Sequence, residues 1–190
     1  MCKLMKCHKS LLVLGLLFFG LLGTAPVSSA LDVGDTAPDF SLPATTGGKI
    51  SLSQFRGKKL VLLEFYGADF SPVCASNLST RMADYSKFEA LNVQILGISS
   101  NIPFSQKTFA DSLKLPYPLL SDAPDLKVIR NYGGLNPQWD MTTAQRWFFL
   151  IDLQGTVRGQ WRGSTNEVFP SEPILRVARE IASRTSQGNK

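Results

Sequence analysis

One cysteine is the side chain best placed to do chemistry. Cys74 follows Ser71, Pro72 and Val73, where Ser71 is a favoured helix N-cap and Pro72 suits the first helical position. The sequence therefore predicts Cys74 in the first turn of a helix, beside unpaired backbone N–H groups and the positive end of the helix dipole. Both features favour the thiolate, which is the nucleophilic form of cysteine.

The positions of the other cysteines and of the histidine restrict this chemistry. Cys2, Cys7 and the only histidine, His8, all lie in the first thirty residues. The rest of the chain has one cysteine and no histidine, which excludes from it a Cys-His or Ser-His-Asp catalytic group, a Cys/His zinc site and an internal disulfide. We expect neither a metal nor a cofactor. A single cysteine in an oxidising compartment suggests a reactive thiol or an intermolecular partner.

The first thirty residues have the pattern of an export signal. Three lysines precede an apolar run at residues 11–22, and small residues at 28–30 fit a cleavage site. We expect a signal peptide at residues 1–30 and one mature domain at residues 31–190, delivered to a periplasm or to the outside. An uncleaved segment that anchors the protein to a membrane is the less favoured alternative, because glycines interrupt the run.

The charge balance does not indicate a nucleic-acid partner. The predicted signal contains three lysines and no acidic residue, so the mature chain has 17 basic and 15 acidic residues and a net charge of +2 instead of +5. Its basic residues are scattered along the sequence. We therefore expect no nucleic-acid binding.

Patterns around Cys74 predict the elements that hold it. Residues 60–65 form a nearly continuous apolar run that ends at Gly67, which is typical of a strand buried on both faces. Apolar residues then recur at helical spacing to Phe88, and a second buried strand follows at residues 93–99. A strand, a helix and a strand in this order predict a parallel crossover.

The flanking segments complete an α/β fold. Alternating and turn-forming residues predict an N-terminal β-hairpin near residues 40–52 and a second hairpin at residues 146–161. Helices are expected at residues 103–113 and 125–130, and an amphipathic helix at residues 170–184. We expect a mixed central sheet with flanking helices.

Four segments form an ordered combination that spans nearly all of the predicted mature chain. The segments are Ala37-Pro38-Asp39-Phe40-Ser41-Leu42, Tyr66 to Cys74, Leu120-Ser121-Asp122 through Tyr132-Gly133, and Arg146 through Gly155. In this order they resemble the peroxiredoxins of the alkyl hydroperoxide reductase and thiol-specific antioxidant family, in the thioredoxin-like superfamily.

The resemblance assigns catalytic roles to three residues. Cys74 would be the peroxidatic cysteine, Ser71 the hydroxyl that holds the peroxide, and Arg146 the cation that stabilises the thiolate and polarises the O–O bond. Other residues of the motif are expected to shape the loop or contact the substrate, namely Gly67, Pro72, Val73 and Asn77.

Two positions depart from the family pattern. Gly67 stands where the family has a proline, and Asn77 stands where it usually has a glutamate. Glycine should loosen the loop that proline stiffens. Asn77 should still accept one hydrogen bond from the arginine in place of the glutamate. Both changes predict a peroxidase activity that is weaker than usual or absent.

Together with the predicted signal peptide and the single cysteine, the resemblance implies an exported one-cysteine thiol peroxidase that reduces hydrogen peroxide or organic hydroperoxides. An external thiol, either a thioredoxin-like protein or a small thiol, would recycle it, and the resemblance also allows a homodimer. One alternative is a thiol-disulfide oxidoreductase, although Ser71 occupies the place of that group's first cysteine. The other is a non-catalytic redoxin domain that acts as a sensor or a binding module.

Overall fold

A strand of six buried residues, β3 (Leu60–Phe65), forms the centre of a five-stranded mixed sheet. The computed structural model describes residues 31–140 and 142–188, so the predicted signal peptide lies outside the described residues. Strands β4 (Val93–Ser99) and β5 (Leu119–Ser121) continue the sheet on one side of β3 in parallel orientation, which confirms the predicted parallel arrangement.

The other side of β3 is antiparallel. Strand β6 (Trp147–Ile151) pairs with β3, and β7 (Val157–Arg162) pairs with β6, which confirms the second predicted hairpin. The sheet order is therefore β5-β4-β3-β6-β7. Strands β1 (Ser41–Pro43) and β2 (Lys49–Ser51) form the predicted N-terminal hairpin as a separate two-stranded sheet.

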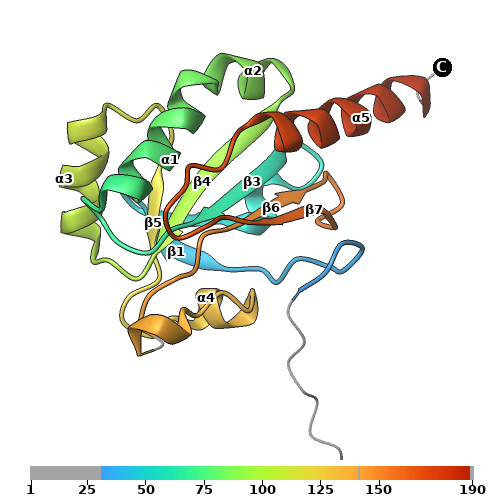
Figure 1. The fold of residues 1–190 in the computed structure, drawn as a ribbon. Coiled ribbons are helices and arrows are strands. Elements are labelled where there is room, and N and C mark those ends of the chain that lie inside the picture. The colour runs from blue at the N-terminus through green and yellow to red at the C-terminus, as the bar shows by residue number, and fades with distance from the viewer. Residues whose placement is uncertain (1–30, 141, 189–190) are drawn as a thin grey trace, which may run out of the picture.

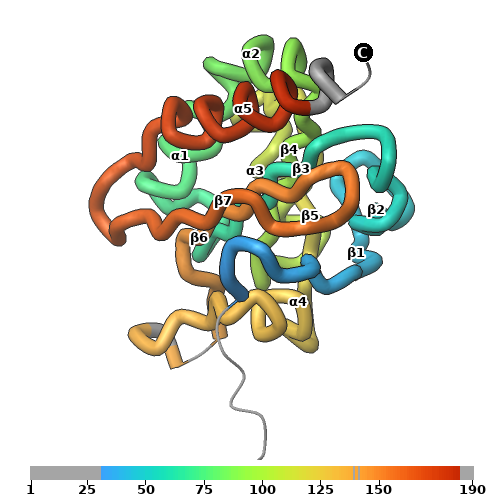
Figure 2. The backbone as a smooth tube through the Cα atoms, turned by 90° about the vertical axis from the view of Figure 1, so that its right-hand side faces the viewer, coloured from blue at the N-terminus to red at the C-terminus, as the bar shows by residue number. Residues whose placement is uncertain are grey.

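Helices cover both faces of the large sheet (Figure 1). Helices α1, α2 and α5 lie on one face and α4 lies on the other, an arrangement that the perpendicular view also shows (Figure 2). The helices within the described ranges are α1 (Pro72–Ala83), α2 (Tyr85–Ala90), α3 (Pro103–Leu113), α4 (Lys127–Asn131) and α5 (Glu172–Gly188), with single 3-10 turns η1 (Leu52–Phe55) and η2 (Pro137–Trp139). None of these helices combines the length and apolar character needed to cross a membrane.

The side chains of β3 alternate between the two faces of the sheet and contribute to a separate core cluster on each face. Leu60 and Leu62 pack with residues of α1, α2, α3 and α5, whereas Val61 and Leu63 pack with the N-terminal hairpin and α4. Successive side chains of a strand point to opposite faces, so Glu64 belongs to the α1 side. The strand therefore carries one acidic residue into the core beneath the helix of Cys74.

Candidate active site

Cys74 is the third residue of α1, and its side chain is only 1% exposed. The helix begins as the sequence predicts, with Ser71 at the N-cap position and Pro72 at the first helical position. Backbone φ and ψ of −66° and 130° place Ser71 in the extended region that a helix N-cap normally adopts. The core strand β3 and the start of α1 thus fix the position of the sulfur.

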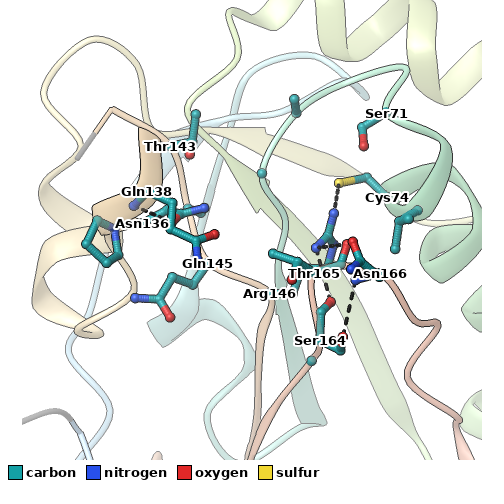
Figure 3. A pocket seen from close by; sticks show the side chains of 16 residues that line it. Ser71, Cys74, Asn136, Gln138, Thr143, Gln145, Arg146, Ser164, Thr165 and Asn166 are labelled. Atoms are coloured by element: carbon teal, nitrogen blue, oxygen red, sulfur yellow. Dashed lines mark hydrogen bonds between the residues drawn. The ribbon is translucent and has the colours of Figure 1, made fainter. Parts of the chain in front are cut away.

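The sulfur of Cys74 faces a pocket of about 760 Å³. Amide and hydroxyl side chains dominate the lining, and Arg146 is its only charged residue. Figure 3 shows the Cys74 sulfur directed toward the Arg146 guanidinium. The lining residues are Gly67, Ala68, Ser71, Val73, Cys74, Asn136, Pro137, Gln138, Thr143, Ala144, Gln145, Arg146, Gly163, Ser164, Thr165 and Asn166.

Five of the seven predicted site residues line this pocket, and the other two do not. Pro72 is exposed at the helix start, where it shapes the loop without contributing to the lining. Asn77 is buried to 1% exposure one helical turn after Cys74, and it does not line the pocket. Within the described ranges, His, Cys, Asp and Glu side chains form no group of three or more that could hold a metal ion.

Arg146, directly before β6, connects the sulfur to a second segment of the chain. Its Nη2 lies 3.7 Å from Cys74 Sγ, and its Nη1 donates to the carbonyl oxygens of Ser164 at 3.1 Å and Thr165 at 3.0 Å. A guanidinium is a permanent, planar cation with several donors. In this position it can stabilise negative charge on the sulfur or on an oxygen bound beside it.

Asn77 does not take the place of the family's glutamate, so that expectation is wrong. Its Nδ2 donates to the carbonyl of Val73 at 2.8 Å, and its Oδ1 accepts from the backbone N–H of Phe169 at 2.9 Å. Both groups are occupied within the protein. Asn77 therefore connects α1 to the segment before α5 instead of bonding to Arg146.

Ser71 occupies the N-cap position without making a side-chain capping bond. Its carbonyl accepts the first helical hydrogen bond, from the N–H of Ala75 at 2.8 Å. The hydroxyl lies on the pocket wall near Cys74. The side chain is thus placed for binding a ligand rather than for stabilising the helix.

Asp69 anchors the loop between β3 and α1, a role that the sequence did not reveal. Its carboxylate accepts hydrogen bonds from the hydroxyls of Tyr66 at 2.8 Å and Ser105 at 2.6 Å. The backbone N–H of Asp69 also donates to Asn101 at 3.2 Å. Burial raises the pKa of Asp69, although the two hydroxyls oppose this rise. The hydrogen bond from Ser105 therefore connects the loop to α3, although the loop begins with a glycine.

Gly67 sits against another part of the pocket wall. A Cβ atom at this position would lie 3.4 Å from the carbonyl oxygen of Ala144, and the backbone of Gly67 is outside the left-handed region. Glycine is therefore not required there by backbone conformation. A Cβ atom would meet the Ala144 carbonyl at about van der Waals contact, so a small side chain would also fit at this position.

The sequence of residues 33–160 matches the AhpC/TSA family. Chloroplastic peroxiredoxin Q of Gentiana triflora is 34% identical over 132 residues, which cover 70% of this chain and 59% of that protein. Chloroplastic 2-Cys peroxiredoxin BAS1 of Hordeum vulgare is 33% identical over 136 residues, which cover 66% of this chain and 63% of that protein. The chain thus spans about three fifths of the length of these relatives.

The fold is similar to that of solved peroxiredoxins. Reduced 2-Cys peroxiredoxin of Plasmodium vivax superposes with a TM-score of 0.74 at 29% identity, covering 82% of this chain and 84% of the other. The agreement covers the sheet and the flanking helices together. It confirms the expected thioredoxin-like α/β architecture.

Proposed function

Because the chain belongs to the AhpC/TSA family of peroxiredoxins, in the thioredoxin-like superfamily, we propose that it is a thiol-dependent peroxidase with Cys74 as its nucleophile. The observation that supports this most directly is the 3.7 Å distance between Arg146 Nη2 and Cys74 Sγ, at the wall of an open pocket. A thiolate becomes an effective nucleophile when a fixed cation and helix N–H groups stabilise it.

The first step is a two-electron transfer from sulfur to peroxide. The Cys74 thiolate attacks the terminal oxygen of the peroxide, an S–O bond forms and the O–O bond breaks. The departing oxygen takes a proton and leaves as water or as an alcohol, so that Cys74 becomes a sulfenic acid. Arg146 and the Ser71 hydroxyl supply hydrogen-bond donors to the oxygens, where charge develops.

Regeneration uses an external thiol in this scheme. Cys74 is the only cysteine in the part of the chain that the structure describes. A first external thiol condenses with the sulfenic acid and releases water, and a second thiol reduces the mixed disulfide to return the Cys74 thiol. The donor is either a thioredoxin-like protein or a small thiol. We therefore propose a one-cysteine cycle, although the named relatives include a 2-Cys type.

The size of the pocket supports more than one peroxide as substrate. A volume of about 760 Å³ falls in the range of pockets that bind small organic molecules. Hydrogen peroxide would fill little of it. The remaining space can take the alkyl group of an organic hydroperoxide, or the incoming thiol in the second half of the cycle.

The proposal includes export of the protein. The pattern of residues 1–30 supports a signal peptide and delivery to a periplasm or to the outside. A homodimer is compatible with the family. Mass spectrometry of the secreted or periplasmic protein would test the signal, since cleavage predicts an N-terminus at Leu31 and a retained segment would contradict it.

Rapid mixing of the reduced protein with hydrogen peroxide or an alkyl hydroperoxide tests the enzymatic proposal. We expect a second-order reaction that consumes one peroxide per protein, is absent in Cys74→Ser, and turns over when a thiol donor is added. A wild-type protein that reacts no faster than free cysteine would contradict the proposal. Disulfide exchange without any reaction with peroxide would favour the oxidoreductase alternative.

A further inference from the structure

Arg81, a buried arginine of α1, donates hydrogen bonds to the chain segment that also accepts hydrogen bonds from Arg146. Arg81 is 0% exposed. Its Nη1 donates to the Ser171 hydroxyl at 2.6 Å, and its Nη2 donates to the carbonyl of Phe169. Arginine is almost never fully buried unless it has a specific partner. These two bonds direct the guanidinium to the segment between β7 and α5, which we call the 163–171 segment.

The ion pair that accompanies Arg81 does not by itself explain why the arginine is there. Glu64 on β3 is 1% exposed, and its Oε2 lies 3.6 Å from Arg81 Nε. Among the described residues neither carboxylate oxygen of Glu64 accepts a hydrogen bond. A buried pair of this geometry stabilises a fold weakly or not at all, because desolvation offsets the attraction. Glu64 is therefore a buried neighbour of Arg81, and the hydrogen bonds of the guanidinium are made to Ser171 and Phe169.

Phe169 is the residue that this anchor fixes most completely. Its carbonyl accepts from Arg81, and its N–H donates to Asn77 Oδ1 at 2.9 Å. Its ring stacks on Phe148, with ring centroids 4.8 Å apart. The guanidinium of Arg81 lies over the same Phe148 ring at 5.4 Å. Both backbone groups and the side chain of Phe169 are therefore held by α1 and β6.

The same segment carries the two acceptors of Arg146. Residues 164–168 are exposed, so the core does not hold them in place. One end is fixed at Gly163, whose N–H donates to the carbonyl of Arg146 at 2.7 Å, and the other end is fixed at Phe169. Between these points the carbonyl oxygens of Ser164 and Thr165 accept hydrogen bonds from Arg146 Nη1. Release of the Phe169 end would let both acceptors move.

We propose that Arg81 is a positioning residue for the reaction at Cys74. It fixes Phe169 and Ser171 and so holds the 163–171 segment in place. The carbonyls of this segment then orient the guanidinium of Arg146 toward the sulfur. The inference rests on the proposed function for its rate measurement, but the reactivity of the Cys74 thiolate tests it independently. Misplacement of a catalytic group by about 1 Å can lower a rate about 100-fold.

The test replaces the pair without leaving a buried charge. In the double variant Glu64→Leu/Arg81→Met, apolar side chains fill the site, and such replacements are generally tolerated by the fold. The matched control is Leu96→Ala, which opens a cavity at β4 in the core cluster on the opposite face of the sheet from the cluster that Phe169 packs against. Circular dichroism and chemical denaturation establish that each variant is folded under assay conditions.

Two rates are then measured, that of Cys74 alkylation by iodoacetamide and that of its oxidation by hydrogen peroxide. We expect the double variant to lose about 10- to 100-fold in the peroxide rate and to alkylate more slowly than the wild type at the same pH, and Leu96→Ala to match the wild type. Unchanged alkylation and oxidation in the folded double variant would overturn the inference. If the wild-type protein does not react with peroxide, the proposed function is wrong. The comparison of alkylation rates still decides the role of Arg81 in that case.

A coupling measurement separates positioning from a general structural effect. If Arg81 acts through Arg146, the double replacement should have no further effect on either rate in an Arg146→Ala background. Equal losses in both backgrounds would overturn the inference. Ser171→Ala provides a second variant that removes one acceptor and keeps the ion pair. It should show a smaller loss of the same kind, and a wild-type rate in this variant would count against the mechanism.

Discussion

Two irregular segments reach the pocket, and each is anchored by one charged side chain of opposite sign. The loop at residues 67–71 leads into the Cys74 helix and is anchored by Asp69, whose carboxylate accepts from two hydroxyls. The 163–171 segment holds Arg146 and is anchored by Arg81, whose guanidinium donates to a carbonyl and a hydroxyl. One segment therefore places the nucleophile and the other places the cation.

The two anchors differ in burial and in their response to pH. Asp69 is half-buried and its partners are neutral, whereas Arg81 is fully buried beside the carboxyl group of Glu64. Burial raises the pKa of Glu64 to about 7, although Arg81 opposes the rise. The difference suggests that pH near neutrality affects the anchor of the cation more than the anchor of the nucleophile.

The largest expected effect is on the cation itself. Arg146→Lys keeps the charge, but an ammonium cannot donate to Ser164, Thr165 and the sulfur with one planar group. We expect the rate of peroxide reduction to fall about 100-fold, as for loss of a donor to a developing charge. Rapid-mixing kinetics measure this rate, and Arg162→Lys on β7 is a control of the same type. An unchanged rate in Arg146→Lys would remove Arg146 from the site.

Glu64→Gln tests the pH response of the buried anchor. The folded state binds the Glu64 proton more tightly than the unfolded state, in which the pKa is near 4.5. This contribution to stability is therefore present at low pH and is lost as the pH rises through about 7.

Chemical denaturation from pH 5 to pH 8 measures this effect. The free energy of unfolding of the wild type, relative to that of Glu64→Gln, should fall by about 2 to 3 kcal/mol over this range. A difference that stays constant with pH would show that Glu64 does not titrate in this window. It would also remove the contrast between the two anchors.

Asp69→Ala tests the anchor of the nucleophile's loop. The buried Tyr66 hydroxyl would lose its acceptor, so we expect the free energy of unfolding to fall by about 1 to 2 kcal/mol. The peroxide rate should fall as well, because the loop precedes the first turn of the Cys74 helix. Asp111→Ala on the exposed face of α3 is the control and should change neither quantity. Full activity in a destabilised Asp69→Ala would show that the loop does not position the thiol.

The smallest effect on stability is expected for Ser71→Ala. Its hydroxyl makes no capping bond, so the free energy of unfolding should change by less than about 0.5 kcal/mol. The peroxide rate should fall, since the hydroxyl lines the pocket. A loss of stability at full activity would mean that the serine is only a helix cap.

Local patterns predict the elements that carry the site. The apolar run of β3 and the serine and proline that begin α1 specify a buried strand and a helix start through interactions between sequence neighbours. They place Cys74 correctly for that reason. The pairing of Cys74 with Arg146 spans 72 residues, and it was expected only because the order of four motifs resembles a known family.

The anchors could not be predicted in the same way. Asp69 meets Ser105 across 36 residues, and Arg81 meets Ser171 across 90 residues. No local pattern marks such contacts, because an arginine in a helix is usually solvated and its partner depends on how distant elements pack. Glu64, an acidic residue within an apolar strand, is a signal in the sequence that could have indicated a buried partner.

The central claim is that Cys74 is the single peroxidatic thiol, and titration with one equivalent of hydrogen peroxide tests it most directly. Cys74 is 1% exposed, so a bridge between two copies is disfavoured. Intact mass and non-reducing electrophoresis should show a monomer heavier by one oxygen, which a sulfenic-acid reagent traps and excess peroxide converts to sulfinic acid. A dominant disulfide-linked dimer would contradict the one-cysteine cycle, and an unmodified Cys74 would contradict the peroxidase itself.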